Sequence, residues 1–185
     1  MPKDIMLFQM LKQFFTGEPE PNHFGMGMTF GQIVASDDNF CVANGTFCLI
    51  DMQYGEFDAS RYSKHESVVM LVWHSAGIIG NGGFDYLFQG PWQGDADYVA
   101  TIEAHRRIGL AKSADAFAAA INQFPGSAMP SDPDERYRAY ITTDEDIRNS
   151  IDALYYEDSD DHRERAVADF VRQYKDQFRH LHKLR

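Results

Sequence analysis

The sequence is poor in cysteine, and this excludes two classes of small protein. Cys41 and Cys48 are the only cysteines among the 185 residues. Two thiols cannot form the several disulfides that hold small secreted scaffolds together, and they cannot complete a four-thiol zinc site. We therefore expect a chain from a reducing compartment, the cytoplasm, in which both cysteines act as small apolar side chains.

Long apolar segments are also missing. The longest run without a charged residue extends from Ser67 to Phe84, a stretch of 18 residues that contains a histidine, an asparagine and four glycines. A membrane-spanning helix needs about 20 mostly apolar residues. The apolar stretch at residues 5–11 is too short for a signal peptide and has a charged residue on each side. The sequence predicts neither a signal peptide nor a membrane partner.

Basic residues are few compared with acidic ones. The chain has 17 Lys and Arg against 28 Asp and Glu, a formal net charge of -11. Residues 95–161 hold 15 acids and 6 bases, whereas residues 162–185 hold 3 acids and 7 bases. Phosphate backbones repel so acidic a chain, and we expect no direct contact with nucleic acid. The expected partner is a basic protein, which can itself be a DNA-binding protein, and a homodimer stays open.

The acids of the middle third occur in three clusters, which are the candidate partner-binding residues. A surface that imitates DNA must present carboxylates in rows, because each strand carries a phosphate about every 3.4 Å of axis. Acids four positions apart on a helix are separated by about 6 Å. Helix capping and solubility are the alternative explanation, since acids are favourable in the first turn of any helix. The candidate residues are Asp132, Asp134, Glu135, Asp144, Glu145, Asp146, Glu157, Asp158, Asp160 and Asp161.

The motifs of the common enzyme classes are absent from the sequence. It contains no P-loop, no dinucleotide fingerprint after a strand and no Gly-x-Ser-x-Gly elbow. The seven histidines form no metal-binding helical pair, and the apolar surroundings of His74 and His105 favour hydrogen-bonded core histidines. We expect no catalytic residue, no metal and no cofactor.

Helical periodicity covers most of the chain after residue 60. Apolar residues from Val167 to Leu181 recur at steps of three and four, which predicts a helix over 161–179 with Ser159 as its N-cap. Similar patterns predict helices over 66–79, 95–108 and 112–124, another that begins at Thr143, and an N-terminal helix over 7–15. The residues around Val69 are apolar on all sides, which predicts a central helix. The fold class expected is all-α, a single compact helical domain.

Residues 17–60 do not follow such a pattern, because Gly, Pro, Asn and Asp interrupt each short apolar run. We interpret this stretch as an irregular N-terminal elaboration, in which residues 46–52 form either a short strand or a buried helical turn. The domain division that follows is an N-terminal helix with an irregular elaboration over 1–60 and a helical domain over 61–185. Residues 125–133 hold three prolines and predict an exposed loop.

A short motif, Asn81-Gly82-Gly83-Phe84, directly follows the most apolar helix. Adjacent glycines after an asparagine allow backbone conformations that other residues avoid. The motif therefore predicts a turn that terminates the helix, with a positive φ at one glycine or both and with Phe84 buried in the core.

This motif carries a resemblance to a known family. Together with Ile108-Gly109-Leu110 and the small-residue helix from Ala114 to Ala120, it resembles the DNA mimic protein 19-like family, over residues 65–178. The resemblance implies an all-helical, non-enzymatic fold. With the acidic composition, it predicts a non-catalytic protein-interaction module, a DNA mimic or an inhibitor of a basic or nucleic-acid-binding protein. The alternative is a small-molecule-binding protein or an enzyme with a pocket near the turn.

Overall fold

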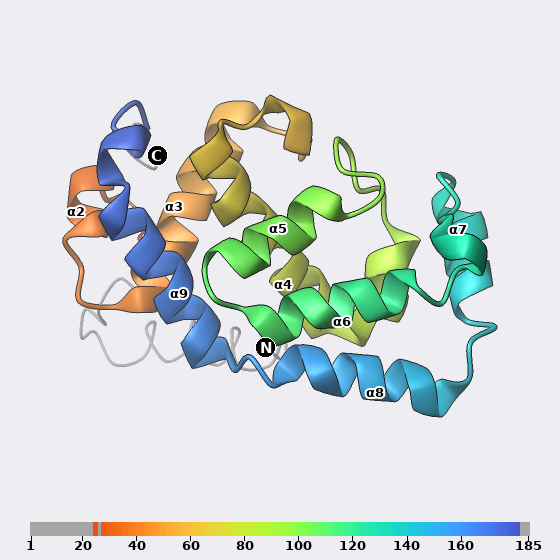
Figure 1. The fold of residues 1–185 in the computed structure, drawn as a ribbon. Coiled ribbons are helices and arrows are strands. Elements are labelled where there is room, and N and C mark those ends of the chain that lie inside the picture. Colours follow the sequence, from red (N-terminus) through yellow and green to blue (C-terminus); the bar gives the residue numbers. More distant parts are fainter. Residues whose placement is uncertain (1–23, 26, 182–185) are drawn as a thin grey trace, which may run out of the picture.

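The computed structural model describes residues 24–25 and 27–181 of the chain. Every regular element within these ranges is a helix, which confirms the predicted all-α class (Figure 1). The helix predicted over residues 7–15 lies outside the described residues. In order, the α-helices are α2 (Phe30–Val34), α3 (Asn39–Tyr54), α4 (Lys64–Gln89), α5 (Val99–Arg107), α6 (Ala111–Ile121), α7 (Pro133–Tyr140), α8 (Glu145–Tyr156) and α9 (Asp160–Gln173).

Helix α4 is the centre of the fold, as its all-round apolar character predicts. Val69, Met70 and Val72 are fully buried, and α4 packs against α3, α5, α7, α8 and α9. A capping box begins the helix: Ser63 N donates to the Glu66 carboxylate, and Glu66 N donates to Ser63 Oγ. No helix of the described residues has both the length and the apolar character needed to cross a membrane.

Helix α3 corrects the interpretation of residues 17–60 as irregular. Asn39–Tyr54 forms a 16-residue helix that includes the undecided stretch 46–52, and Asp38 caps it by accepting a hydrogen bond from Phe40 N at 2.9 Å. Gly45 permits close packing here instead of making a turn. A Cβ at this position would lie 3.0 Å from Ile33 Cδ1 of α2. The glycine that obscured the helical pattern thus brings α2 and α3 together.

The C-terminal helix α9 is predicted correctly in position, although it ends earlier than expected. Ser159 is its N-cap and accepts a hydrogen bond from His162 N. The α-helix ends at Gln173, and a short 3-10 helix follows over Lys175–Phe178. The buried side chains of Val167 and Val171 belong to its apolar stripe. Helix α9 packs extensively against α3 and also contacts α4.

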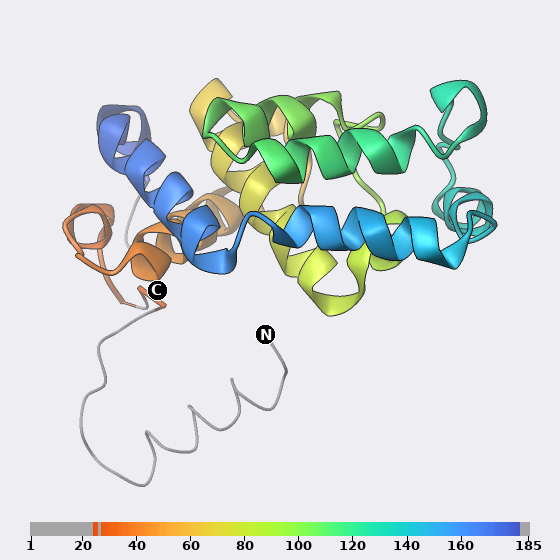
Figure 2. The same ribbon diagram turned by 60° about the horizontal axis from the view of Figure 1, so that its bottom comes forward.

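Helices α5, α6 and α8 form a layered group, with α6 packed against both of the others. Helix α5 begins later than predicted because Asp95 organises the preceding turn: its carboxylate accepts hydrogen bonds from Ala100 N and Thr101 N. Helix α8 begins at Glu145, and its N-cap is Asp144 instead of the predicted Thr143. The predicted loop over 125–133 contains a 3-10 turn at Pro125–Ser127. Figure 2 shows α8 and α9 following one another along one side of the molecule.

Candidate interaction surface

The Asn-Gly-Gly-Phe motif breaks helix α4 without ending it. Gly83 has φ 66° and ψ -163°, and helical structure resumes at once and continues to Gln89. The prediction of a positive φ is confirmed, whereas the prediction that the helix terminates there is wrong. The helix resumes because Asp152 of α8 supplies a cap: its Oδ1 accepts a hydrogen bond from Phe84 N at 3.0 Å.

The break in α4 fits closely against α8. A Cβ on Gly83 would lie 2.1 Å from Asp152 Oδ2, so only glycine leaves room for this carboxylate. Phe84 is fully buried, as predicted, and its ring meets the ring of Phe117 at 5.0 Å between centroids. Asn81 Nδ2 donates to Gly77 O at 2.7 Å. The four motif residues therefore join two helices.

Charged groups complete this joint between α4 and α8. Arg148 of α8 forms an ion pair with Asp85 of α4, and its Nε donates to Thr143 O at 3.2 Å. Burial raises the pKa of the Asp152 carboxyl, and the hydrogen bond from Phe84 N acts in the opposite direction. Arg148 and Asp152 thus bind groups of α4, whereas Asp144 at the start of α8 is exposed.

The motif does not line either of two hollows found among the described residues. One hollow of about 500 Å³ is lined by Asp95, Ile121 and Met129, among others. A second, of about 320 Å³, lies between α5 and α9. The alternative of a ligand pocket near the motif gains no support from either hollow.

Six of the candidate acids, which we call the corner acids, lie on α7 and at the start of α8. All six are exposed, and Figures 1 and 2 show α7 and the N-terminal end of α8 at the same end of the molecule. Two of them cap their helices and one pairs with Arg138 at 3.8 Å. The side chains of Glu145 and Asp146 form no ion pair with any described residue. The corner acids are Asp132, Asp134, Glu135, Asp144, Glu145 and Asp146.

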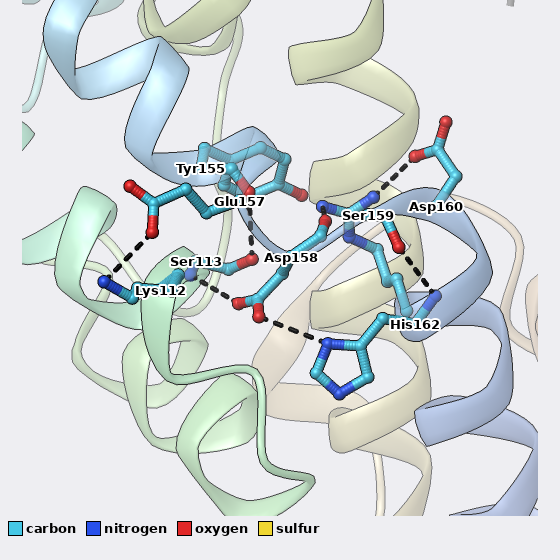
Figure 3. A network of polar contacts seen from close by, with 9 residues as sticks. Lys112, Ser113, Tyr155, Glu157, Asp158, Ser159, Asp160 and His162 are labelled. Atoms are coloured by element: carbon cyan, nitrogen blue, oxygen red, sulfur yellow. Dashed lines mark hydrogen bonds and ion pairs between the residues drawn. The ribbon is translucent and has the colours of Figure 1, made fainter.

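The other four candidate acids lie where α8 meets α9, and we call them the junction acids. They are Glu157, Asp158, Asp160 and Asp161. Asp158 is only 5% exposed, and its Oδ2 accepts a hydrogen bond from Ser113 N of α6 at 2.7 Å (Figure 3). Glu157 pairs with Lys112 at 3.0 Å. Asp158 was a candidate for partner binding, and its burial makes it a structural residue instead. The sequence could not separate it from its neighbours because all stand in one acidic run.

Two further acids that the sequence analysis did not single out adjoin the junction acids. Glu164 is half-buried on α9, and burial raises its pKa, followed by the charges of Asp161, Asp160 and Asp38. Asp38 is the N-cap of α3 and stands more than 100 residues earlier in the chain. Only the packing of α3 against α9 brings these groups together, so no local sequence signal could have found them.

A buried polar cluster supports the junction acids from inside. The Arg163 guanidinium lies over the Tyr155 ring at 4.6 Å, and its Nη2 donates to Asp158 O at 2.8 Å. His105 is fully buried, and its Nδ1 lies 2.8 Å from Thr101 O, which confirms the predicted core histidine. Burial lowers the pKa of His105 to about 4, so the ring is neutral at pH 7.

His74, the other histidine assigned to the core, is half-buried and lies against aromatic rings. Its ring stacks on Phe57 at 4.4 Å and on Trp92 at 5.4 Å between centroids. Among the residues that the structure describes, no group of three or more His, Cys, Asp or Glu side chains is arranged to hold a metal ion.

Comparison with known proteins identifies one family. The family model described as DMP19-like protein matches residues 60–174. The matched region contains the break in α4, all the corner acids and all the junction acids, and it extends to the end of α9. No curated protein and no solved structure matches the chain significantly.

Proposed function

The chain belongs to the family of DMP19-like proteins, and we propose that it acts without catalysis, by binding a basic protein. The binding surface of this proposal is the acidic edge, which consists of the corner acids, the exposed junction acids Glu157, Asp160 and Asp161, and the adjoining Asp38 and Glu164. The family description itself names no activity, so the proposal is supported by the placement of the charges.

Helix α8 sets the spacing of the acidic edge. Its 12 residues span about 18 Å, with the corner acids at one end and the junction acids at the other. That length corresponds to about five phosphates along one DNA strand. Of the ten candidate acids, only Asp158 is buried. Exposed acids that cap helices keep their negative charge and still contribute to the field outside the protein.

The observation that carries the proposal is the crowding of acids around Glu164. Burial raises the pKa of Glu164 most, and the charges of Asp161, Asp160 and Asp38 raise it further, while Arg163 acts in the opposite direction. A basic partner would relieve this repulsion, whereas a requirement for solubility alone would be met equally well by dispersed charges. Within this proposal, a protein that normally binds DNA is the partner class that the edge suits best.

The experiment compares two variants that change the net charge equally. The edge variant carries Glu145→Lys, Asp146→Lys and Asp161→Lys. The control variant carries Asp51→Lys, Glu56→Lys and Glu103→Lys at exposed positions outside the edge. None of these six side chains caps a helix or forms an ion pair with a described residue. Both variants are expected to fold as the natural chain does, which circular dichroism checks.

Proteins captured from the host lysate by the natural chain are identified, and the most enriched basic one is purified for binding measurements. We expect the edge variant to weaken binding at 50 mM salt by at least about tenfold and to flatten its salt dependence. The control variant should change the affinity much less, and duplex DNA should compete with the natural chain. Equal binding by both variants, or binding that does not change with salt, would contradict the proposal.

A further inference from the structure

A groove with basic walls lies between α5 and α9, in a protein that is acidic as a whole. It has a volume of about 320 Å³ and is lined by Arg107 and Ile108 at the end of α5 and by His162, Arg165 and Phe170 of α9. Figure 1 shows the end of α5 beside α9. Two arginines from different helices thus face one hollow of the size that small ligands occupy.

Arg107 is held in place by aromatic rings and not by a carboxylate. Its guanidinium lies 5.2 Å from the centroid of Phe170 and 5.8 Å from that of Tyr174. One nitrogen donates a long hydrogen bond of 3.5 Å to Lys64 O. Stacking occupies the faces of a guanidinium and leaves the N–H groups at its edge available. The side chain is therefore oriented in advance, with donors to spare for an oxyanion.

Arg165 supplies further donors from α9, and His162 also lines the groove. Arg165 is exposed, and no carboxylate of the described residues lies within 4 Å of it, although Asp161 and Asp169 stand one turn away on either side. Asp169 also lines the groove and pairs with Arg172 at 3.4 Å. The Nδ1 of His162 lies 3.3 Å from Asp158 Oδ1, and this contact orients the imidazole ring.

Two positively charged side chains, Arg107 and Lys64, lie near His65. The neighbouring His65, whose ring lies 4.8 Å from that of Tyr174, has its pKa lowered by burial and then by Arg107 and Lys64. Arg107 forms no ion pair with a described carboxylate, although Asp169 contributes a negative charge to the lining of the groove.

We propose that this groove binds the phosphate group of a small phosphomonoester. The planar N–H pairs of the two guanidinium groups suit the terminal oxygens of a phosphate, and the carboxylate in the lining, Asp169, is paired with Arg172. The more apolar side chains of Ile108 and Phe170 leave room for a short organic substituent. The groove and the acidic edge share no residue, although both include positions of α9. The proposal for the groove does not depend on the function proposed for the edge.

The test uses glycerol 3-phosphate as the probe, titrated into the full chain at constant ionic strength and followed by calorimetry and by phosphorus NMR. Malonate, a dianion without phosphorus, is titrated in parallel by calorimetry. The variants are Arg107→Gln and Arg165→Gln. The matched control is Arg106→Gln, which removes the same charge one residue away from Arg107, at an exposed side chain that does not line the groove.

We expect saturable binding of glycerol 3-phosphate by the natural chain. Each groove variant should lose affinity by about tenfold or more. The control should change affinity by less than about twofold, because Arg106 acts on the ligand only through screened electrostatics. Because Arg165 makes no hydrogen bond or ion pair with the described residues, Arg165→Gln tests the groove even if Arg107→Gln lowers the melting temperature. Absence of saturable binding, an equal loss in the control, or equal affinity for malonate would overturn the proposal.

Discussion

The two ends of helix α8 have almost the same acidic composition, but only the C-terminal end contains a buried acid, Asp158. At the N-terminal end, Glu145 and Asp146 are exposed and form no ion pair with a described residue. At the C-terminal end, Asp158 is buried against Ser113 N, and its own carbonyl oxygen accepts from Arg163. Acids at the first end are available to a partner, and Asp158 at the second holds α6, α8 and α9 together.

This difference separates two reasons for a chain to be acidic. A buried carboxylate with donors aimed at it stabilises one arrangement of helices, and its removal leaves those donors unpaired. An exposed carboxylate adds to the field around the protein and contributes little to folding. The charge of one short segment therefore serves structure and surface at once, and mutations should separate the two.

The largest effect is expected for Asp158→Ala. The substitution leaves Ser113 N unpaired inside the protein and removes the contact with His162, so unfolding should become easier by about 3 kcal/mol. Asp146→Ala, at the other end of α8, should change stability by less than about 0.5 kcal/mol. Urea denaturation at pH 7 measures both. Similar losses in the two variants would remove the distinction between the ends of the helix.

Gly83→Ala tests the joint between the break in α4 and Asp152 in the middle of α8. A side chain at φ 66° is strained, and its Cβ would collide with the Asp152 carboxylate, so we expect a loss of about 2 kcal/mol. Gly80→Ala is the matched control, because Gly80 is exposed and a Cβ there meets nothing within 4 Å. The control should be neutral or slightly stabilising, since alanine favours helix. Thermal unfolding compares the two, and equal melting would contradict the prediction.

The pH dependence of stability should report on His105, which is buried next to the C-terminal end of α8. The pKa of His105 is about 4 in the folded protein and about 6.5 when unfolded. The unfolded chain therefore binds the proton more readily, and the stability contributed by the neutral ring is present above pH 6.5 and declines as the pH falls toward 4.

Between pH 7 and pH 5 this residue alone should account for about 2 kcal/mol of lost stability. The check is urea denaturation of the natural chain and of His105→Gln at both pH values. The variant lacks the titrating ring, so its stability should fall less over the same interval. Parallel pH profiles would show that His105 does not titrate in this way.

The smallest effect is expected at the exposed end of α8. Glu145→Gln removes a favourable first-turn charge but also reduces repulsion among the corner acids, so stability should change by less than about 0.5 kcal/mol. Calorimetric melting at low and high salt measures the balance. A loss larger than 1 kcal/mol would place Glu145 with the structural acids.

Local pattern predicted the parts of the fold in which burial follows the sequence. The residues around Val69 are apolar on every side of the helix, and those after Val167 form one stripe, so both helices were predicted near their observed places. Helix α3 was missed because its buried face includes Gly45 and Thr46, residues that usually mark turns or surfaces. Gly45 is buried against Ile33 of α2, a contact between two helices that no local pattern contains.

The candidate site shows the same limit. The sequence predicted the unusual backbone of the motif, because Gly82 and Gly83 have few other reasons to stand together. It did not predict Asp152 as the cap of Phe84, nor Asp158 as a buried acid, because both functions come from helices that meet only in the folded chain. The binding roles of the remaining candidate acids stay predictions.

The cap on Phe84 has a consequence for the order of folding. Phe84 and Asp152 are 68 residues apart in the chain, so the last segment of α4, residues 84–89, receives its N-cap only after α8 has docked. Closing so long a loop is slow compared with forming a single helix. The first part of α4 can form early from local interactions, while this segment belongs to a later cooperative unit. The amide hydrogens of residues 84–89 should therefore exchange with solvent at about the same rate as those of α8. Both sets should exchange faster than the amide hydrogens of residues 68–75.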